Sequence, residues 1–470
     1  MRLKAALSRP IPTMSAAFSA VGLTVALVRR RLASTTTASN NAKAWRAFRS
    51  NVSLFGATAD GVEVEAVKLR NKQTGMTATV LQYGATIQSL TVPLPQHKGS
   101  FGKVLDADVM LGFDTLAEYE APANPYFGCV VGPTAGRIEG GAFTLDSIEH
   151  SSLAQNDGCG ETTNLHGGPT GFSNQVWSIT AAAADETSVT LTHTAAEGTG
   201  GYPSSVEASV IYTLTDEGEL KIEYEWTNVG DRDATVVNPT NHSYFNLSSH
   251  SPLIADSPAN SAPLSLAAHT MQLMANRMVE TREDGTGLPT GRLLDIRSED
   301  TATMRGMDLR YPHLVDDKIA EIAAVQPHWP HGDAMVVDRV ARPGQTTYEQ
   351  ASTFELCGIL YSAISNLTMT VHTTAPVIQL YYSTFLGVGA DGETPEPLLG
   401  KKARTYGKHG AICFEAQGFT DEVNTEYRHA PEDEAVVVPP WRLAPGESHV
   451  QTTAYRFRVG APAGHAQLVV

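Results

Sequence analysis

The chain has 470 residues, of which 42% are hydrophobic, so it can bury a large core and its composition is not that of a disordered protein. The first 59 residues hold nine Lys or Arg and no acid, which leaves all 50 acids and only 25 bases in the remainder, a formal charge of −25. So acidic a body lacks the basic face that nucleic acids and anionic lipids need, which argues against both as partners.

The N-terminal segment differs from the rest of the chain. Residues 10–28 carry no charge, three arginines follow at 29–31, and residues 34–41 are rich in Ser, Thr and Asn. Polar residues interrupt the apolar run, so it is a poor membrane span. A membrane is therefore not expected as a partner, unless this run provides the contact. An Arg-rich, Ser-rich leader without acids is typical of a mitochondrion-like transit peptide, with a signal anchor or an extension without address function as alternatives. The protein is therefore expected to be cytoplasmic or organellar. We predict a leader over residues 1–48 and a single domain over residues 49–470.

Strand patterns dominate the predicted domain. Hydrophobic and polar residues alternate in five segments, which are 81–88, 188–194, 206–214, 220–227 and 367–373. A glycine-containing turn at 216–219 joins two of them and predicts a β-hairpin. In the later half only residues 314–325 have the pattern of a helix. Because strands and helices do not alternate along the sequence, we predict an all-β fold class. The length of the chain favours a large antiparallel β-sandwich over a small barrel.

The sequence lacks the motifs of a nucleotide-binding loop and of a paired-cysteine zinc site. There is no glycine-rich phosphate loop. The four cysteines are widely scattered, unlike a disulfide framework or a paired-cysteine zinc site, and are expected to be buried thiols: Cys129, Cys159, Cys357 and Cys413. We predict neither a cofactor nor a metal.

Four segments place titratable residues among turn-forming ones. They are 135–138 with Arg137, 164–168 with His166, 238–247 with His242, and 413–421 with Glu415. A histidine among amides, hydroxyls and aromatics can have its tautomer and ring orientation fixed, and the glycines after His166 let the backbone approach a ligand. Each signal alone is weak, because most of the 15 histidines are ordinary surface or core residues. Together they predict a polar site suited to a carbohydrate, without naming a reaction.

The order and content of these segments resemble the aldose 1-epimerase (mutarotase) family across roughly residues 60–458. The matching segments are 83–85, 111–114, 164–168 with Gly171, Phe172 and Trp177, 240–247, and 415–417 with Asp421 and Asn424. The resemblance implies a galactose mutarotase-like supersandwich of β-strands. It also implies an isomerase that interconverts the α and β anomers of a free aldohexose such as glucose or galactose, with a small-molecule sugar as its partner and with either a monomer or a dimer as the assembly.

The resemblance further implies roles for individual residues. Glu415 would be the general base that takes the proton of the anomeric hydroxyl, and His242 the general acid that protonates the ring oxygen. Each positioned proton transfer typically contributes about 10²- to 10⁴-fold. The hydroxyl-binding residues implied by the family are Arg137, His166, Asp333 and Gln379.

The chain also departs from the family pattern. Gly136 stands where the family usually has Asn, Pro133 stands where it usually has Arg, and Asp333 lacks the usual aromatic residue before it and histidine after it. Insertions are expected around 299–328, 343–354 and 389–397. These departures concern substrate choice more than the acid–base pair. Two alternatives stay open, an epimerase of hexose 6-phosphates, which would need an arginine cluster for the dianion, and a non-catalytic sugar-binding protein of the same fold.

Overall fold

The structure is a computed structural model that describes residues 49–98, 104–157, 162–183, 185–248, 250, 263–297, 302–325, 332–337, 354–389, 394–428 and 441–468. Residues 50–470 form one compact unit. The predicted leader over residues 1–48 and Cys159 lie outside the described residues. Among the residues described, no helix is both long and apolar enough to cross a membrane.

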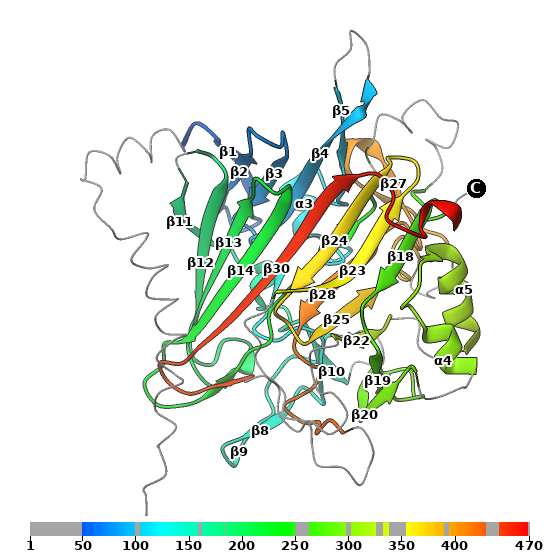
Figure 1. Ribbon diagram of the computed structural model, residues 1–470. Helices are drawn as coiled ribbons and strands as arrows, with labels where there is room; N and C mark the ends of the chain where they lie inside the picture. Colours follow the sequence, from blue (N-terminus) through cyan, green and yellow to red (C-terminus); the bar gives the residue numbers. More distant parts are fainter. Residues whose placement is uncertain are drawn as a thin grey trace, which may run out of the picture. The chain divides into compact units, whose positions relative to one another are not determined.

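A nine-stranded antiparallel sheet forms the larger layer (Figure 1). Its strands, in spatial order, are β11 (Ser178–Ala182), β12 (Ser188–Ala195), β13 (Val206–Leu214), β14 (Glu219–Asn228), β30 (Ser448–Val459), β24 (Leu367–Thr373), β23 (Glu355–Ser362), β18 (His269–Leu273) and β21 (His313–Leu314). The last long strand of the chain therefore lies fifth of nine, between β14 and β24.

The predicted hairpin is confirmed. Strands β13 and β14 pair from Val206↔Asn228 to Leu214↔Leu220. Along both strands, buried residues alternate with partly exposed ones, as the alternating sequence requires when one face of a sheet packs on a core. Strands β12 and β24 likewise coincide with the predicted segments 188–194 and 367–373.

A six-stranded sheet forms the second layer. Its strands, in order, are β17 (Tyr244–Phe245), β28 (Ile412–Gln417), β25 (Val377–Tyr381), β22 (Ala334–Val336), β19 (Arg277–Thr281) and β20 (Pro289–Asp295). Strand β28 lies against β30 of the larger sheet, where the Tyr455 hydroxyl donates a hydrogen bond to the Phe414 carbonyl at 3.0 Å. In Figure 1, β28 and β25 lie behind β24 and β23. The predicted antiparallel β-sandwich is thus confirmed.

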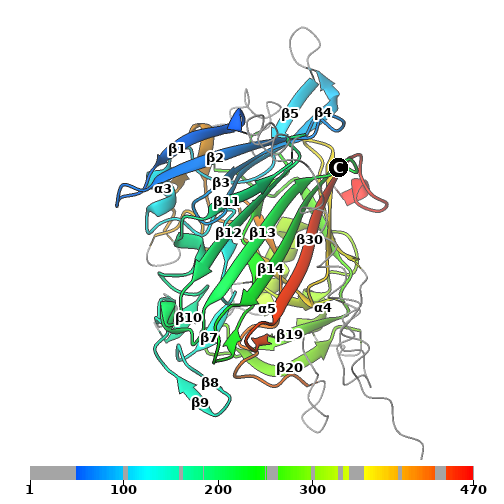
Figure 2. The same ribbon diagram turned by 90° about the vertical axis from the view of Figure 1, so that its left-hand side faces the viewer.

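A five-stranded sheet continues the molecule beside β11 and β12 (Figure 2). Its strands are β1 (Val52–Ala57), β2 (Glu63–Arg70), β3 (Thr77–Leu81), β4 (Ile87–Lys98) and β5 (Val104–Asp108). The predicted strand over 81–88 is wrong, because the chain turns between β3 and β4. Gly84 and Ala85 have positive φ angles of 63° and 45°, which reverse the chain inside an alternating pattern.

Five two-stranded ladders complete the described strands. They are β6 (Val130–Val131) with β16 (Thr240–Asn241), β7 (Arg137–Glu139) with β10 (Thr163–Leu165), β8 (Phe143–Leu145) with β9 (Ile148–His150), β15 (Thr235–Val236) with β29 (Arg442–Leu443), and β26 (Leu398–Leu399) with β27 (Thr405–Tyr406).

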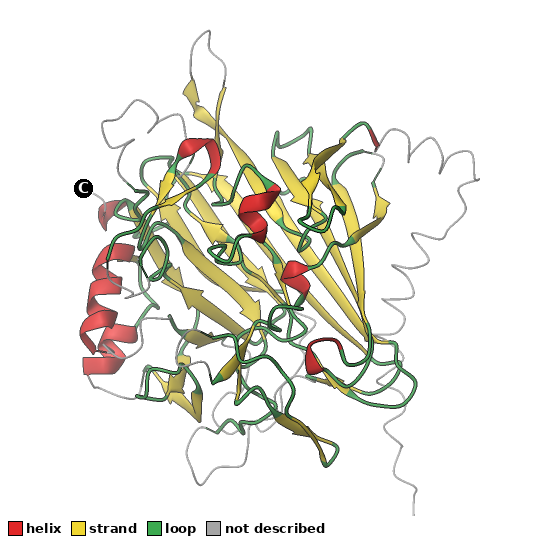
Figure 3. Ribbon diagram, turned by 180° about the vertical axis from the view of Figure 1, so that it is seen from behind, coloured by secondary structure: helices red, strands yellow, loops and turns green. Residues whose placement is uncertain are grey.

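Helices are short in the described chain (Figure 3). They are α3 (Leu116–Glu120), α4 (Ala302–Met307) and α5 (Val315–Val325), with 3₁₀ turns at Phe172–Asn174, Thr199–Gly201, Lys401–Ala403 and Ala466–Leu468. The helix predicted over 314–325 is confirmed as α5, and α4 was not predicted.

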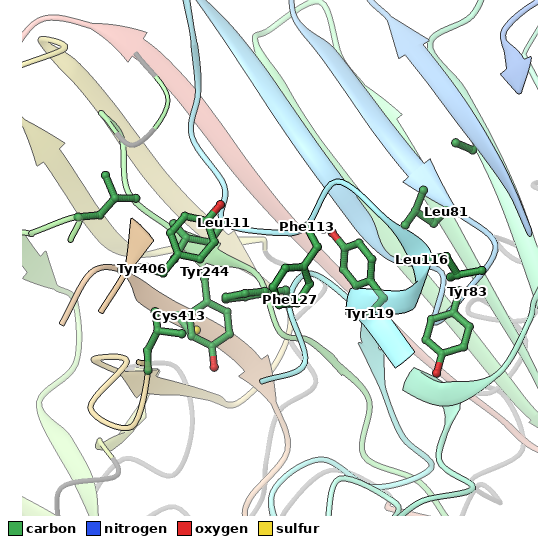
Figure 4. Packing of buried hydrophobic residues seen from close by; sticks show 14 of the residues in the cluster. Leu81, Tyr83, Leu111, Phe113, Leu116, Tyr119, Phe127, Tyr244, Tyr406 and Cys413 are labelled. Carbon is green, nitrogen blue, oxygen red and sulfur yellow. Dashed lines mark hydrogen bonds between the residues drawn. The ribbon is translucent and has the colours of Figure 1, made fainter. Parts of the chain in front are cut away.

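One hydrophobic cluster joins the five-stranded sheet to the six-stranded sheet. Figure 4 shows its aromatic part, in which the Phe127 ring meets the Tyr244 ring edge-on at 4.9 Å and the Tyr406 ring at 5.6 Å. Aromatic rings in this arrangement stabilise a core beyond the area that they bury. Tyr244 and Cys413 belong to the same cluster and face one another across β17 and β28. The core therefore extends to the strands that carry the candidate site.

Candidate active site

One face of the six-stranded sheet and the loops beside it enclose a cavity of about 550 Å³. Its described lining residues are Pro125, Tyr126, Gly136, Arg137, Asp157, Leu165, His166, His242, Tyr244, Val279, Thr281, Gly287, Pro289, Gly332, Ala334, Gln379, Tyr381, Phe385, Val388, Gly389, Glu415, Gln417 and Thr420. Five of the six residues expected at the site therefore lie around one cavity.

Glu415 lies in β28 and faces the cavity. Strand pairing places Gln379 directly opposite it on β25. Glu415 is 3% exposed, and burial raises the pKa of its carboxyl to about 8, against a smaller lowering by the Arg137 charge. Burial disfavours the ionised form because the site offers less solvation than water. Glu415 is thus a far weaker acid than an exposed glutamate.

His242 lies between β16 and β17, where the backbone holds it on both sides. Its N–H donates to the Cys129 carbonyl, and its carbonyl accepts from the Gly128 N–H, both at 2.9 Å. The imidazole Nε2 lies 3.6 Å from Glu415 Oε1. Burial lowers the pKa of His242 to about 4. The acid and base expected from the sequence are therefore neighbours in one cavity.

Two tyrosines and a cysteine fix the plane of the His242 ring. Tyr126 and Tyr244 stack on it with interplanar angles of 23° and 19°. Cys413 Sγ lies 3.7 Å from Nδ1, on the side of the ring away from Glu415. The Cys413 thiol contacts Nδ1, so Nε2 is the ring nitrogen that faces the cavity and Glu415.

His166 presents a hydrogen-bond donor to the same cavity. Its Nδ1 accepts from the Gly136 backbone N–H at 3.2 Å, so the hydrogen of the neutral ring is on Nε2. Burial lowers its pKa well below the usual value, and the charges of His242 and Arg137 lower it further. Its ring meets the His242 ring nearly at right angles, with centroids 5.3 Å apart. A neutral Nε2–H suits the binding of a sugar hydroxyl.

Arg137 begins β7 and is held by a carboxylate. Its Nε donates to Asp157 Oδ2 at 2.5 Å, and the same oxygen accepts from the Thr163 hydroxyl at 2.9 Å. Asp157 is 3% exposed and lines the cavity with Arg137. The pair orients the guanidinium toward the cavity and offsets its charge.

Asp333 is placed differently from the other expected residues. Its neighbours Gly332 and Ala334 line the cavity, whereas Asp333 does not. Side chains of a strand alternate between its two faces, and Asp333 pairs with Leu380, whereas Ala334 pairs with Gln379. Its carboxyl accepts a hydrogen bond from the Tyr382 hydroxyl at 3.3 Å, and burial raises its pKa to about 7. In this arrangement the Asp333 side chain lies on the face of the strand away from the cavity.

Three of the lining residues that were not predicted individually make contacts important to the site or carry a polar group into it. Asp157 had no signal, because nothing in its local sequence marks it as the partner of Arg137. Tyr126 has a positive φ of 64° and contacts both histidine rings. Gln417 could have been found, since a residue two places after Glu415 on a strand faces the same way.

The nitrogen and oxygen atoms of His166, His242 and Glu415 lie within 4.8 Å of one another, which is close enough for three ligands of one metal ion. The hydrogen bond from Gly136 opposes this use, because it leaves a proton on His166 Nε2 and no lone pair there for a metal. The arrangement instead offers donors and acceptors for hydroxyl groups, together with an acid–base pair.

Comparisons with known proteins identify the family of the chain. A family model described as aldose 1-epimerase matches residues 65–456. Bovine galactose mutarotase is 30% identical over 415 residues, which cover 88% of this chain and 98% of the relative. Mouse galactose mutarotase is 32% identical over 405 residues, covering 85% and 95%. The crystal structure of an aldose epimerase homologue from C. elegans has a TM-score of 0.62 and 26% identity, and covers 84% of this chain and 99% of that one.

The fold and these matches define an isomerase that acts as an epimerase. The chain belongs to the aldose 1-epimerase family.

Proposed function

We propose that this enzyme interconverts the α and β anomers of free aldohexoses, glucose or galactose, by acid–base opening and reclosure of the ring. The observation that carries the proposal is the 3.6 Å separation of His242 Nε2 and Glu415 Oε1 inside the cavity. Ring opening requires a base on the anomeric oxygen and an acid on the ring oxygen, and both oxygens are bonded to C1. A pair this close can reach both of them at once.

In the proposed reaction, the Glu415 carboxylate takes the proton from the anomeric hydroxyl while His242 Nε2 gives a proton to the ring oxygen. The bond between C1 and the ring oxygen breaks, and C1 becomes an aldehyde. After rotation about C1–C2, His242 takes the proton back from the hydroxyl at C5. Glu415 returns its proton to the new anomeric oxygen, and the ring closes from the other face.

The shifted pKa values support this exchange. Burial raises the pKa of Glu415 to about 8 and lowers that of His242 to about 4, so each of the two residues is stable without charge. The pair holds one shared proton throughout the cycle. The proton lies on Glu415 in the free enzyme, moves to His242 in the form that opens the ring, and is back on Glu415 in the open-chain intermediate. Its net charge is therefore constant, and a buried site never has to solvate an unpaired charge.

Hydroxyl recognition is proposed for Arg137, His166 and Gln379. All three line the cavity with the acid–base pair. Arg137 is the only Arg or Lys among the described lining residues, and Asp157 pairs with it. A 6-phosphate carries nearly two negative charges and would need several cations at once. The lining therefore favours a neutral sugar over its phosphate.

The test compares initial polarimetric rates for freshly dissolved α-glucose and α-galactose with those for glucose 6-phosphate and galactose 6-phosphate. We expect kcat/KM for the free hexoses to exceed that for the phosphates by at least about 10²-fold, equivalent to about 2.7 kcal/mol. A higher kcat/KM for the phosphates would refute the proposed substrate class. Binding of hexoses without epimerisation would instead identify a non-catalytic sugar-binding protein.

A further inference from the structure

The cavity contains a buried amide that the proposed reaction does not use. Gln417, the last residue of β28, is 1% exposed. Neither its Nε2 nor its Oε1 has a hydrogen-bond partner among the described residues, although both atoms are buried. Each unmade hydrogen bond of a buried polar group costs about 1–3 kcal/mol. An amide that lines a cavity in this state is suited to bind a ligand with hydroxyl groups.

The backbone on both sides of Gln417 is fixed, which sets the position of the amide. The Ala416 carbonyl accepts hydrogen bonds from the Thr240 hydroxyl at 3.0 Å and from Gln451 Nε2 at 2.8 Å. The Gly418 N–H donates to Asn238 Oδ1 at 2.7 Å. None of the three partner residues lines the cavity, so these contacts leave the cavity side of Gln417 open.

Gly136 keeps the space in front of the amide free. A Cβ atom at this position would lie 3.1 Å from the Thr420 hydroxyl and 3.6 Å from Gln417 Nε2. Gly136 also has a φ of 70°, which other residues rarely adopt. Gln417 and Thr420 therefore border the cavity next to a position without a side chain.

The place of Gln417 along β28 indicates which part of a sugar it would meet. It follows Glu415 by two residues on the same face, about 6–7 Å farther along the strand. Cys413, which contacts His242, precedes Glu415 by two residues, so His242 and Gln417 lie toward opposite ends of the strand. A pyranose held by C1 at Glu415 and His242 carries its C3 and C4 hydroxyls on the opposite side of the ring.

We propose that the Gln417 amide binds a hydroxyl on the C3–C4 side of the sugar and is a specificity-determining residue of this enzyme. The assignment rests on the proposed function, because the acid–base pair defines where C1 lies. It extends that function by naming a residue that selects the substrate away from the reacting atoms.

Gln451 provides a matched control. It is also a buried glutamine beside β28, but it lies on the core side and its amide donates to the Ala416 carbonyl. Gln417→Leu should raise KM for glucose or galactose by roughly ten-fold, the value of one hydrogen bond, with kcat within about three-fold. Because it removes an unsatisfied amide, Tm should be unchanged or higher. Gln451→Leu should lower Tm and change KM by less than about two-fold, because the Thr240 hydroxyl still donates to the Ala416 carbonyl.

Deoxy sugars identify the hydroxyl. The ratio of KM between Gln417→Leu and wild type should fall to about one for the deoxy sugar that lacks the bound hydroxyl, either 3-deoxyglucose or 4-deoxyglucose. It should stay near ten for the other deoxy sugar. It should also stay near ten for xylose, which lacks C6. The same comparison is made by calorimetric binding of each sugar.

Two results would overturn the assignment. One is a Gln417→Leu variant whose KM and calorimetric Kd stay within two-fold of wild type for glucose and for galactose. The other is an equal loss on 3-deoxyglucose, 4-deoxyglucose and xylose. A wild-type protein without epimerase activity on any hexose would refute the proposed function instead, and the calorimetric comparison would still decide the role of Gln417.

Discussion

Replacing Glu415 by Gln tests the proposed base with the least change of shape. The amide is nearly isosteric with the protonated carboxyl and cannot accept the anomeric proton. We expect kcat to fall by about 10²- to 10⁴-fold, the usual contribution of a general base. KM should change little, because the hydroxyl contacts proposed for Arg137 and His166 are unaffected.

The same substitution should increase stability, because the carboxyl is protonated in the folded protein and ionised in the unfolded chain. Burial raises the pKa of Glu415 from 4.5 to about 8. The folded state therefore binds more protons than the unfolded state between these pH values, and its stability falls as pH rises through them. At 1.36 kcal/mol per pKa unit, keeping the proton at pH 7 costs about 3 kcal/mol. Glutamine removes this cost.

The assay combines polarimetry with thermal unfolding at pH 5, 7 and 8. Relative to wild type, the Tm of Glu415→Gln should rise progressively with pH while its activity is lost. Glu422→Gln is the control, since burial also raises the pKa of Glu422 but this residue does not line the cavity. It should keep wild-type kcat. Near wild-type activity in Glu415→Gln would refute the assignment of the base, and a Tm gain that does not depend on pH would refute the electrostatic reasoning.

Three further predictions follow from the site and the sequence. His242→Ala should lower kcat by at least about 10²-fold, whereas His166→Ala should mainly raise KM; steady-state polarimetry distinguishes them, and the reverse pattern would exchange their roles. The pH profile of kcat/KM should be bell-shaped, falling below about 4, where the Glu415–His242 pair gains a second proton, and above about 8, where it loses its last one. A flat profile from pH 7 to 10 would contradict this. Deleting residues 1–48 should leave a soluble enzyme with unchanged kcat/KM, and an insoluble truncation would show that the leader packs on the domain.

The strands whose sequences alternate could be predicted, because burial of one face imposes a period of two. This holds for β13 and β14, where the pattern is long and a glycine turn joins the strands. The pattern failed at 81–88, since Gly84 and Ala85 turn the chain without disturbing the alternation of residue types. Periodicity describes which face a residue occupies and not where a strand ends.

The site could be predicted only in part from the sequence. The resemblance gave the cavity residues that occur in recognisable motifs, such as His166 and His242. The register of β22 against β25 decides on which face of the sheet the Asp333 side chain lies. A shift of one residue would move this side chain to the other face. Asp157 joins Arg137 only through tertiary packing, for which the local sequence carries no signal.

The position of β30 has a consequence for synthesis of the protein on the ribosome. This strand follows all the other described strands in the sequence, yet it fills the centre of the nine-stranded sheet, and its Gln451 and Tyr455 hold the backbone of β28. Until residues 448–459 emerge from the exit tunnel, the nascent chain has two partial sheets with unpaired inner edges at β14 and β24. Exposed edges of this kind invite pairing with other chains. We therefore expect nascent chains that lack β30 to depend on chaperones, and β28 to take its final position only after β30 has paired.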